Sequence, residues 1–152
     1  METNDREDRG SVDAIVRALY ETISGPAGQE RDLRRFRALF INGARLIRTE
    51  TLDDGRAQAV VLDLEEYLRA ATSYFRQHGF YESEVARKVD TFGNVVHVFS
   101  TYESRHSADD PEPFARGINS IQLFKDGGRY QVVTILWDFE RPDNPIPPEY
   151  LQ

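Results

Sequence analysis

Three side chains in the C-terminal half of the chain have the chemistry to act as an acid, a base or a hydrogen-bond donor. His97 stands within the apolar run 95–99, Tyr102 follows it, and Asp138 comes directly after Trp137. An imidazole or a carboxylate can move a proton, and a phenol can donate to an enolate-like oxygen. We therefore expect acid/base chemistry by His97 or Asp138, with Tyr102 as the donor. The alternative is structural: a buried, hydrogen-bonded His97, and a Trp137 that packs in the core or an interface.

A second group of polar residues interrupts apolar strand faces, which is typical of a pocket wall. Ser100 and Tyr102 fall on the strand face that begins with Val96, and Asn119 falls on the face of Gly117 in the next strand. A glycine beside a polar group leaves room for a ligand. The predicted ligand-binding residues are these two polar groups, an aromatic wall and a helix tyrosine: Ser100, Asn119, Trp137 and Tyr20. The alternative is that the polar groups bond to one another across the strands and that the rings pack in the core.

Composition excludes several other kinds of chemistry. The chain of 152 residues has no cysteine, and its three histidines are dispersed, so we expect no metal site and no organic cofactor. A net charge of -7 and a pI near 5.0 disfavour binding to nucleic acid. The apolar runs are too short to span a membrane, and the mixed-charge N-terminus lacks the apolar core of a signal peptide. These features predict a cytoplasmic protein without a membrane partner.

The N-terminal half is expected to supply helices that position these residues. Residues 1–10 are highly charged and predict a disordered segment. Apolar residues then recur with helical spacing from Val12 to Ile23, after a predicted N-cap at Ser11, and again over about 30–40. A third helix is expected after Asp63, where Asp63 and Glu66 match a capping box, and it ends at Gly79. Short strands are expected at 44–49 and 58–62.

After Gly79 the apolar period changes to two, which indicates strands. Four long strands are predicted over 81–92, 95–105, 114–125 and 129–140, joined by tight turns at 93–94 and 126–128 and by a longer loop at 107–113. Sequential strands joined in this way form an antiparallel sheet. The prediction is an α+β domain over 11–140, with three N-terminal helices packed on a strongly curved, mostly antiparallel sheet of about six strands. A proline-rich tail follows over 141–152.

The last long strand predicts a partner for the sheet. Both of its faces are apolar, because Val132 and Leu136 alternate with Val133, Ile135 and Trp137. One layer of helices covers only one face of a sheet, and an exposed apolar face of this size is unusual. We therefore expect a homodimer formed through the sheet face.

The order of these elements resembles the nuclear transport factor 2-like (NTF2-like) superfamily, with its cystatin-like α+β cone fold, and in particular its bacterial SnoaL-like members. The similarity spans about 12–140, and its local marks are Leu39-Phe40 followed by Gly43 to Leu46, and Gly127 to Tyr130. The resemblance implies a pocket between the helices and the concave sheet face, and dimers through the other face. It leaves activity open, because the superfamily includes isomerases, dehydratases, cyclases, ligand binders and non-catalytic scaffolds.

Arg48 enters the candidate site through this resemblance. Ketosteroid isomerase, an enzyme of this fold, uses an aspartate base on the first strand and a tyrosine on the first helix. Ungapped matching from Ala44 places these positions near Arg48 and Ala18. An arginine stays protonated and is no base, so that mechanism is not supported here. In the pocket, Arg48 would instead bind an anionic or carbonyl-bearing ligand; the alternative is a rim arginine paired with Glu50 or Asp53.

Together these features predict a protein that binds a small hydrophobic, aromatic or polyketide-like molecule in an apolar pocket. The catalytic version is a cofactor-independent isomerase, cyclase or dehydratase. The alternative is a non-catalytic ligand-binding or dimerisation module, in which the same polar groups are structural.

Overall fold

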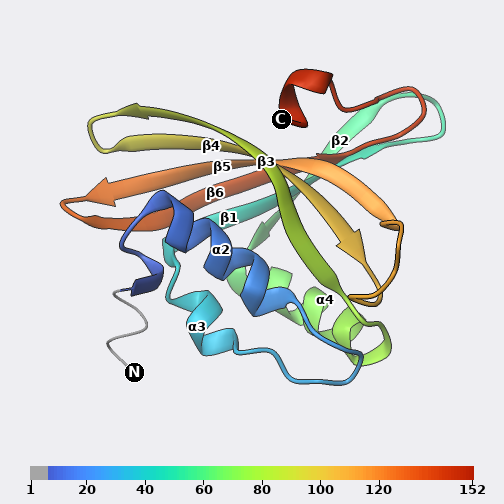
Figure 1. Ribbon diagram of the computed structural model, residues 1–152, viewed down its shortest axis with the longest axis horizontal. Coiled ribbons are helices and arrows are strands. Elements are labelled where there is room, and N and C mark those ends of the chain that lie inside the picture. The colour runs from blue at the N-terminus through green and yellow to red at the C-terminus, as the bar shows by residue number, and fades with distance from the viewer. Residues whose placement is uncertain (1–6) are drawn as a thin grey trace.

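The protein forms one curved six-stranded sheet with its helices on one face, as seen in the computed structural model, which describes residues 7–152 (Figure 1). The strand order is β2-β1-β6-β5-β4-β3. All neighbouring strands are antiparallel except β1 and β6, which run parallel. The strands are β1 (Phe40–Thr51), β2 (Ala57–Asp63), β3 (Tyr81–Phe92), β4 (Val95–Arg105), β5 (Ala115–Asp126) and β6 (Arg129–Phe139). The expected α+β fold with about six strands is confirmed.

Two amphipathic helices have the caps that their sequences predict. Helix α2 (Val12–Ile23) begins after Ser11, whose side chain accepts from the Ala14 amide. Helix α4 (Leu64–Gln77) begins with the expected capping box, in which Asp63 and Glu66 satisfy each other's backbone amides. These bonds fix the helix starts, and therefore fix which side chains face the sheet.

Helix α3 (Leu33–Arg37) is much shorter than the helix expected over 30–40. The chain leaves the helix early because Phe40 already pairs with Val132 of β6, and the Leu39 carbonyl accepts from the Val132 amide at 2.7 Å. Pairing with a distant strand outweighs the helical spacing of the apolar residues, which is a local preference only.

The core lies between the helices and the inner face of the sheet. Helix α2 buries one face, including Ile15, Val16 and Leu19, against apolar residues of β4 and β5 such as Val98 and Ile121. A bulge between Glu84 and Ala86 changes which residues of β3 face this core, so that Glu82, Glu84 and Arg87 all lie opposite inward-facing residues of β4.

Both ends of the described chain pack against this domain. Residues 1–6 of the segment expected to be disordered lie outside the described residues. In the remainder, Asp8 forms an ion pair with Arg35, and the Arg9 carbonyl accepts from the Tyr130 amide. Residues 7–10 therefore contact the domain.

The C-terminal tail crosses the face of the sheet opposite the helices (Figure 1). Thr101 donates to the Tyr150 carbonyl at 2.6 Å, the Tyr150 ring lies 5.1 Å from that of Phe99, and Ile146 is buried. The tail ends in a short 3-10 turn, η1 (Pro148–Tyr150). The chain itself therefore covers part of the outer sheet face. No helix of the described residues is long and apolar enough to cross a membrane.

Candidate functional site

A cavity of about 420 Å³ lies between the helices and the inner face of the sheet. Its walls are mostly aromatic and aliphatic side chains from α2, α3, α4, β1, β2, β5 and β6. Polar groups from β3, β4 and β5 also line it. Tyr74 and Phe114 line the cavity and are the most exposed of its large side chains, so they mark its rim. An apolar cavity of this size with a few polar groups is typical of a small-molecule site.

Glu82 is the acidic group of this cavity, and the sequence analysis did not select it. It is the second residue of β3 and lies opposite Ser104 of β4, whose hydroxyl donates to the Glu82 carboxylate at 3.3 Å. Burial raises the pKa of Glu82 to about 7, although hydrogen bonds from Ser104 and Asn119 favour the ionised form. Near neutral pH, Glu82 therefore exists in both protonation states, as a general acid/base must.

Three tyrosines around Glu82 are neutral hydroxyl groups. Burial, and secondly the charge of Glu82, raises the pKa of Tyr20, Tyr67 and Tyr102 above the usual range. Among residues 7–152, no hydrogen bond is formed by the hydroxyls of Tyr67 and Tyr102, so both are available to a ligand. A neutral phenol in an apolar cavity is a suitable donor to an oxygen that becomes negative.

Gly117 provides the space for the Tyr102 hydroxyl. A Cβ atom on this residue would lie 2.5 Å from the Tyr102 oxygen and 2.4 Å from the Asp138 carbonyl oxygen. Any larger residue would therefore displace Tyr102 or the neighbouring β6 backbone. Only glycine therefore fits at position 117 without a shift of its neighbours.

Another part of the cavity wall combines an aromatic ring with a cation. Trp137 of β6 lies in register with Arg48 of β1, and the Trp137 ring meets the Tyr67 ring edge-on at 6.3 Å. Arg48 lines the cavity and also donates to Glu50 at 2.5 and 3.1 Å. The pocket and rim interpretations of Arg48 therefore both describe part of its environment.

The structure brings together most of the predicted ligand-binding residues and the predicted donor Tyr102. Tyr20, Arg48, Tyr102, Asn119 and Trp137 line the same cavity. Ser100 lies just behind this wall and is bonded to the Tyr20 hydroxyl at 2.7 Å.

His97 and Asp138, the two predicted acid/base groups, lie on the other face of the sheet. His97 is bonded to the Ser120 hydroxyl at 2.8 Å, and Asp138 accepts from Arg141 at 2.8 Å near the C-terminal tail. Each is next in sequence to a residue that faces inward, Val98 and Trp137, and successive side chains of a strand point to opposite faces. Neither His97 nor Asp138 lines the cavity, so the expectation that they act there is not met, and the carboxyl group among the lining residues is that of Glu82.

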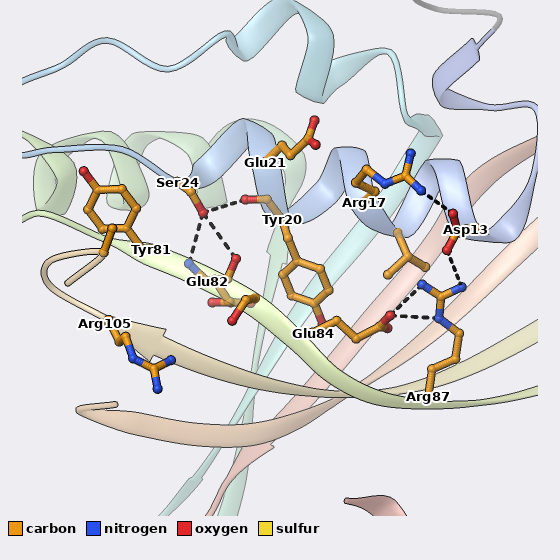
Figure 2. Close-up of a pocket in the computed structure, with 13 residues that line it drawn as sticks. Asp13, Arg17, Tyr20, Glu21, Ser24, Tyr81, Glu82, Glu84, Arg87 and Arg105 are labelled. Atoms are coloured by element: carbon orange, nitrogen blue, oxygen red, sulfur yellow. Dashed lines mark hydrogen bonds and ion pairs between the residues drawn. The ribbon is translucent and has the colours of Figure 1, made fainter. Parts of the chain in front are cut away.

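A polar groove of about 570 Å³ adjoins the cavity between α2 and β3 (Figure 2). Tyr20 and Glu82 line both spaces and so form part of the wall between them. Several charged side chains of the groove are paired: Glu84 accepts from Arg87 at 2.5 Å, and Asp13 forms ion pairs with Arg87 and Arg17. Within residues 7–152, no three His, Cys, Asp or Glu side chains form a group that could hold a metal ion.

Comparison with known proteins identifies the fold. No protein-family model and no curated protein matches the sequence. A protein of unknown function with a cystatin-like fold from Nostoc punctiforme superposes with a TM-score of 0.64 at 10% identity, over 90% of this chain and 92% of that one. The beta subunit of a candidate aromatic-ring-hydroxylating dioxygenase from Novosphingobium aromaticivorans gives 0.60 at 15% identity, over 88% and 89%.

A candidate ketosteroid isomerase from Shewanella frigidimarina gives a TM-score of 0.54 at 12% identity, over 82% of this chain and 91% of that one. The chain therefore has the cystatin-like, NTF2-like α+β cone fold that the sequence pattern indicated. At these identities the likeness is one of fold.

Proposed function

We propose that this protein binds a small apolar molecule carrying a carbonyl group and catalyses a proton transfer on it, with Glu82 as the general acid/base. The observation that carries the proposal is a partly buried carboxyl group in the wall of an aromatic-lined cavity, with its pKa raised to about 7 by burial. Such a group takes up and releases protons at neutral pH without a large cost in either direction. The rim of Tyr74 and Phe114 and the wall at Trp137 favour an aromatic or polyketide-like ligand.

The proposed step uses only side chains of this chain. The Glu82 carboxylate removes a proton from the carbon next to the carbonyl group, and the electron pair moves onto the carbonyl oxygen. The Tyr102 hydroxyl, with Tyr67 nearby, donates to that oxygen as it becomes negative. In a ligand with a C=C bond between its β and γ carbons, the electron pair returns from the oxygen, the carbonyl re-forms, and protonated Glu82 delivers the proton to the γ carbon, which is an isomerisation. In a ligand with a hydroxyl group on the β carbon, the carbonyl re-forms as a C=C bond forms and the C–O bond breaks, and protonated Glu82 gives its proton to the departing hydroxyl, which leaves as water in a dehydration.

The fold comparison is consistent with this proposal, because a candidate ketosteroid isomerase shares the cone architecture. In this chain the acid lies on β3 rather than on the first strand, where Arg48 stands. The proposed enzyme would therefore reach similar chemistry from a different wall of the same cavity.

The alternative is a non-catalytic ligand-binding module. Glu82 already receives hydrogen bonds from Ser104 and Asn119, and Tyr20 bonds to Ser100, so part of the polar wall is satisfied without a ligand. A binding module would bind the same apolar molecules and leave their protons in place.

Deuterium exchange separates the two functions. The probe is 2-tetralone, a bicyclic aromatic ketone, incubated with the protein in D₂O, and NMR follows deuteration next to the carbonyl group. We expect acceleration by the wild type and a loss of about 100-fold or more in Glu82→Gln, the range of general-base catalysis. The matched control is Glu103→Gln, which removes a carboxylate paired with Arg105 outside the cavity lining and should leave the rate unchanged. Saturable tetralone binding without acceleration would support the binding module.

A further inference from the structure

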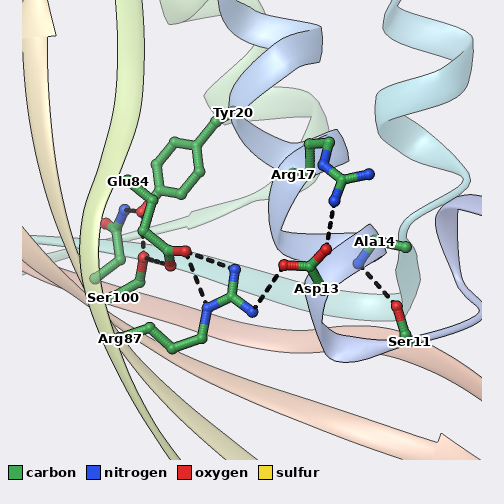
Figure 3. Close-up of polar contacts among 9 residues, drawn as sticks. Ser11, Asp13, Ala14, Arg17, Tyr20, Glu84, Arg87 and Ser100 are labelled. Carbon is green, nitrogen blue, oxygen red and sulfur yellow. Dashed lines mark hydrogen bonds and ion pairs between the residues drawn. The ribbon is translucent and has the colours of Figure 1, made fainter.

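Behind the cavity wall, four polar side chains form a continuous chain of hydrogen bonds into the groove. Asn119 donates to the Tyr20 hydroxyl at 3.1 Å, Tyr20 bonds to Ser100 at 2.7 Å, and Ser100 donates to Glu84 at 2.5 Å. Figure 3 shows Tyr20, Ser100, Glu84 and Arg87 in this sequence. Ser100 is completely buried and Tyr20 and Asn119 nearly so, so water does not substitute for these partners.

The direction of this chain follows from the chemistry of its outer end. Glu84 is a carboxylate held by Arg87 through two hydrogen bonds, at 2.5 and 2.9 Å, and a carboxylate only accepts. Ser100 therefore gives its single hydrogen to Glu84, and its oxygen must accept from Tyr20. The Tyr20 hydrogen is thereby used, so Tyr20 can only accept from Asn119.

This direction determines which way the Asn119 amide faces. With its hydrogen committed to Ser100, the Tyr20 oxygen would repel the amide oxygen of Asn119, so the NH₂ group must face Tyr20. Asn119 also lines the cavity together with Glu82, the proposed acid/base, and its side-chain amide favours the ionised form of that carboxyl group. The Asn119 amide thus connects the chain of hydrogen bonds to the Glu82 carboxyl group.

We propose that the Glu84–Arg87 ion pair is a positioning device for the cavity, which acts through Ser100 and Tyr20 to hold the Asn119 amide with its NH₂ group toward Tyr20 and Glu82. Glu84 lines the groove and is absent from the cavity lining, so it acts without touching the ligand. The role in catalysis rests on the proposed function, whereas the direction of the chain does not.

Glu84→Gln should reverse the donor-to-acceptor direction of the hydrogen bonds in this chain. Arg87 only donates, so the amide oxygen of the new side chain turns to Arg87 and its NH₂ group turns to Ser100. Ser100 then donates to Tyr20, Tyr20 donates to Asn119, and the Asn119 amide flips to accept. An amide oxygen beside Glu82 disfavours the carboxylate.

The test is the titration of Glu82 in the unliganded protein, followed by NMR of ¹³C-labelled glutamate carboxyl groups, with Glu82→Gln to assign the signal. We expect Glu84→Gln to raise the pKa of Glu82 by roughly half a unit to one unit. Simple electrostatics predicts the opposite, because removal of a negative charge leaves Arg87 unbalanced and favours the carboxylate. A lowered or unchanged pKa would overturn the proposal.

Two further variants keep this test decisive. Ser100→Ala breaks the chain without a change in charge, and should shift the pKa of Glu82 upward and move the ¹H and ¹⁵N signals of the Asn119 side-chain amide. Glu103→Gln, which also removes a carboxylate paired with an arginine, should change neither signal. The proposal fails if Ser100→Ala leaves both signals in place. The result is independent of the proposed function, because a directed chain could position Glu82 in a protein that fails to exchange protons on tetralone.

Discussion

Replacing Glu82 by glutamine should change how the stability of the protein depends on pH. Burial raises the pKa of Glu82 from its usual 4.5 to about 7, so the folded state binds a proton more tightly than the unfolded state. Between these two values the folded state holds more protons, so stability falls as pH rises through this window. From the difference between the two pKa values, ionisation of Glu82 destabilises the folded state by about 3 kcal/mol at pH 8. This destabilisation is absent at pH 4.

Glutamine does not titrate, so the difference in unfolding free energy between Glu82→Gln and the wild type isolates this contribution. We expect urea unfolding from pH 4 to pH 8 to show the variant gaining on the wild type by about 3 kcal/mol over that range. The contrasting control is Glu50→Gln. Hydrogen bonds from Gln58 and then Arg48 lower the pKa of Glu50, so this variant should lose stability relative to wild type as pH rises. A flat difference for Glu82→Gln, or one of the opposite sign, would refute the burial of its charge.

Three other predictions concern packing, capping and assembly. Gly117→Ala should lower stability by about 1–3 kcal/mol in thermal unfolding and weaken tetralone binding, because its Cβ would overlap Tyr102 and the β6 backbone; Gly128→Ala, with open space around it, should do neither. Asp63→Ala should cost about 1 kcal/mol through loss of the α4 capping box, and an unchanged urea midpoint would contradict that bonding. The expected homodimer remains a proposal, supported by the paired strand positions Phe92, Val95 and Phe124, which are 87%, 63% and 42% exposed; light scattering should give a dimer for wild type and a monomer for Phe92→Ser, whereas a monomeric wild type would contradict it.

The long strands were predictable because their signals are local. Alternation of apolar residues and the glycine turns at 93–94 and 126–128 place β3 to β6 within about one residue of their observed bounds. The capping box at Asp63 likewise depends on neighbours in sequence. The end of α3 was not predictable in this way, because it depends on pairing between Phe40 and Val132, which lie far apart in the chain.

The sequence indicated several residues of the cavity wall, but it did not indicate the acidic residue Glu82. Tyr102 and Asn119 interrupt apolar strand faces and therefore stand out, and Tyr20 lies on the apolar face of its helix. Glu82 alternates with Glu84 at the start of a strand, a pattern typical of a solvent-facing edge. Only the register opposite Ser104 and Tyr102, together with the bulge after Glu84, places that edge over the cavity.

The preference for His97 and Asp138 came from residue type rather than position. Each has suitable chemistry, yet each neighbours a residue whose side chain fills the inner face, so alternation directs it outward. A register argument of this kind requires knowledge of which face is covered by the helices, and that is a property of the whole fold.

The central claim is that Glu82 exchanges protons with a ligand inside the cavity. The most direct test is the pH dependence of tetralone deuteration by the wild type and by Glu82→Gln. Because the ionised form is the base, the wild-type rate should rise with pH, pass its midpoint near a pKa of about 7 and then level off, while the variant shows no such step. Equal rates and equal pH profiles for the two proteins would contradict the account.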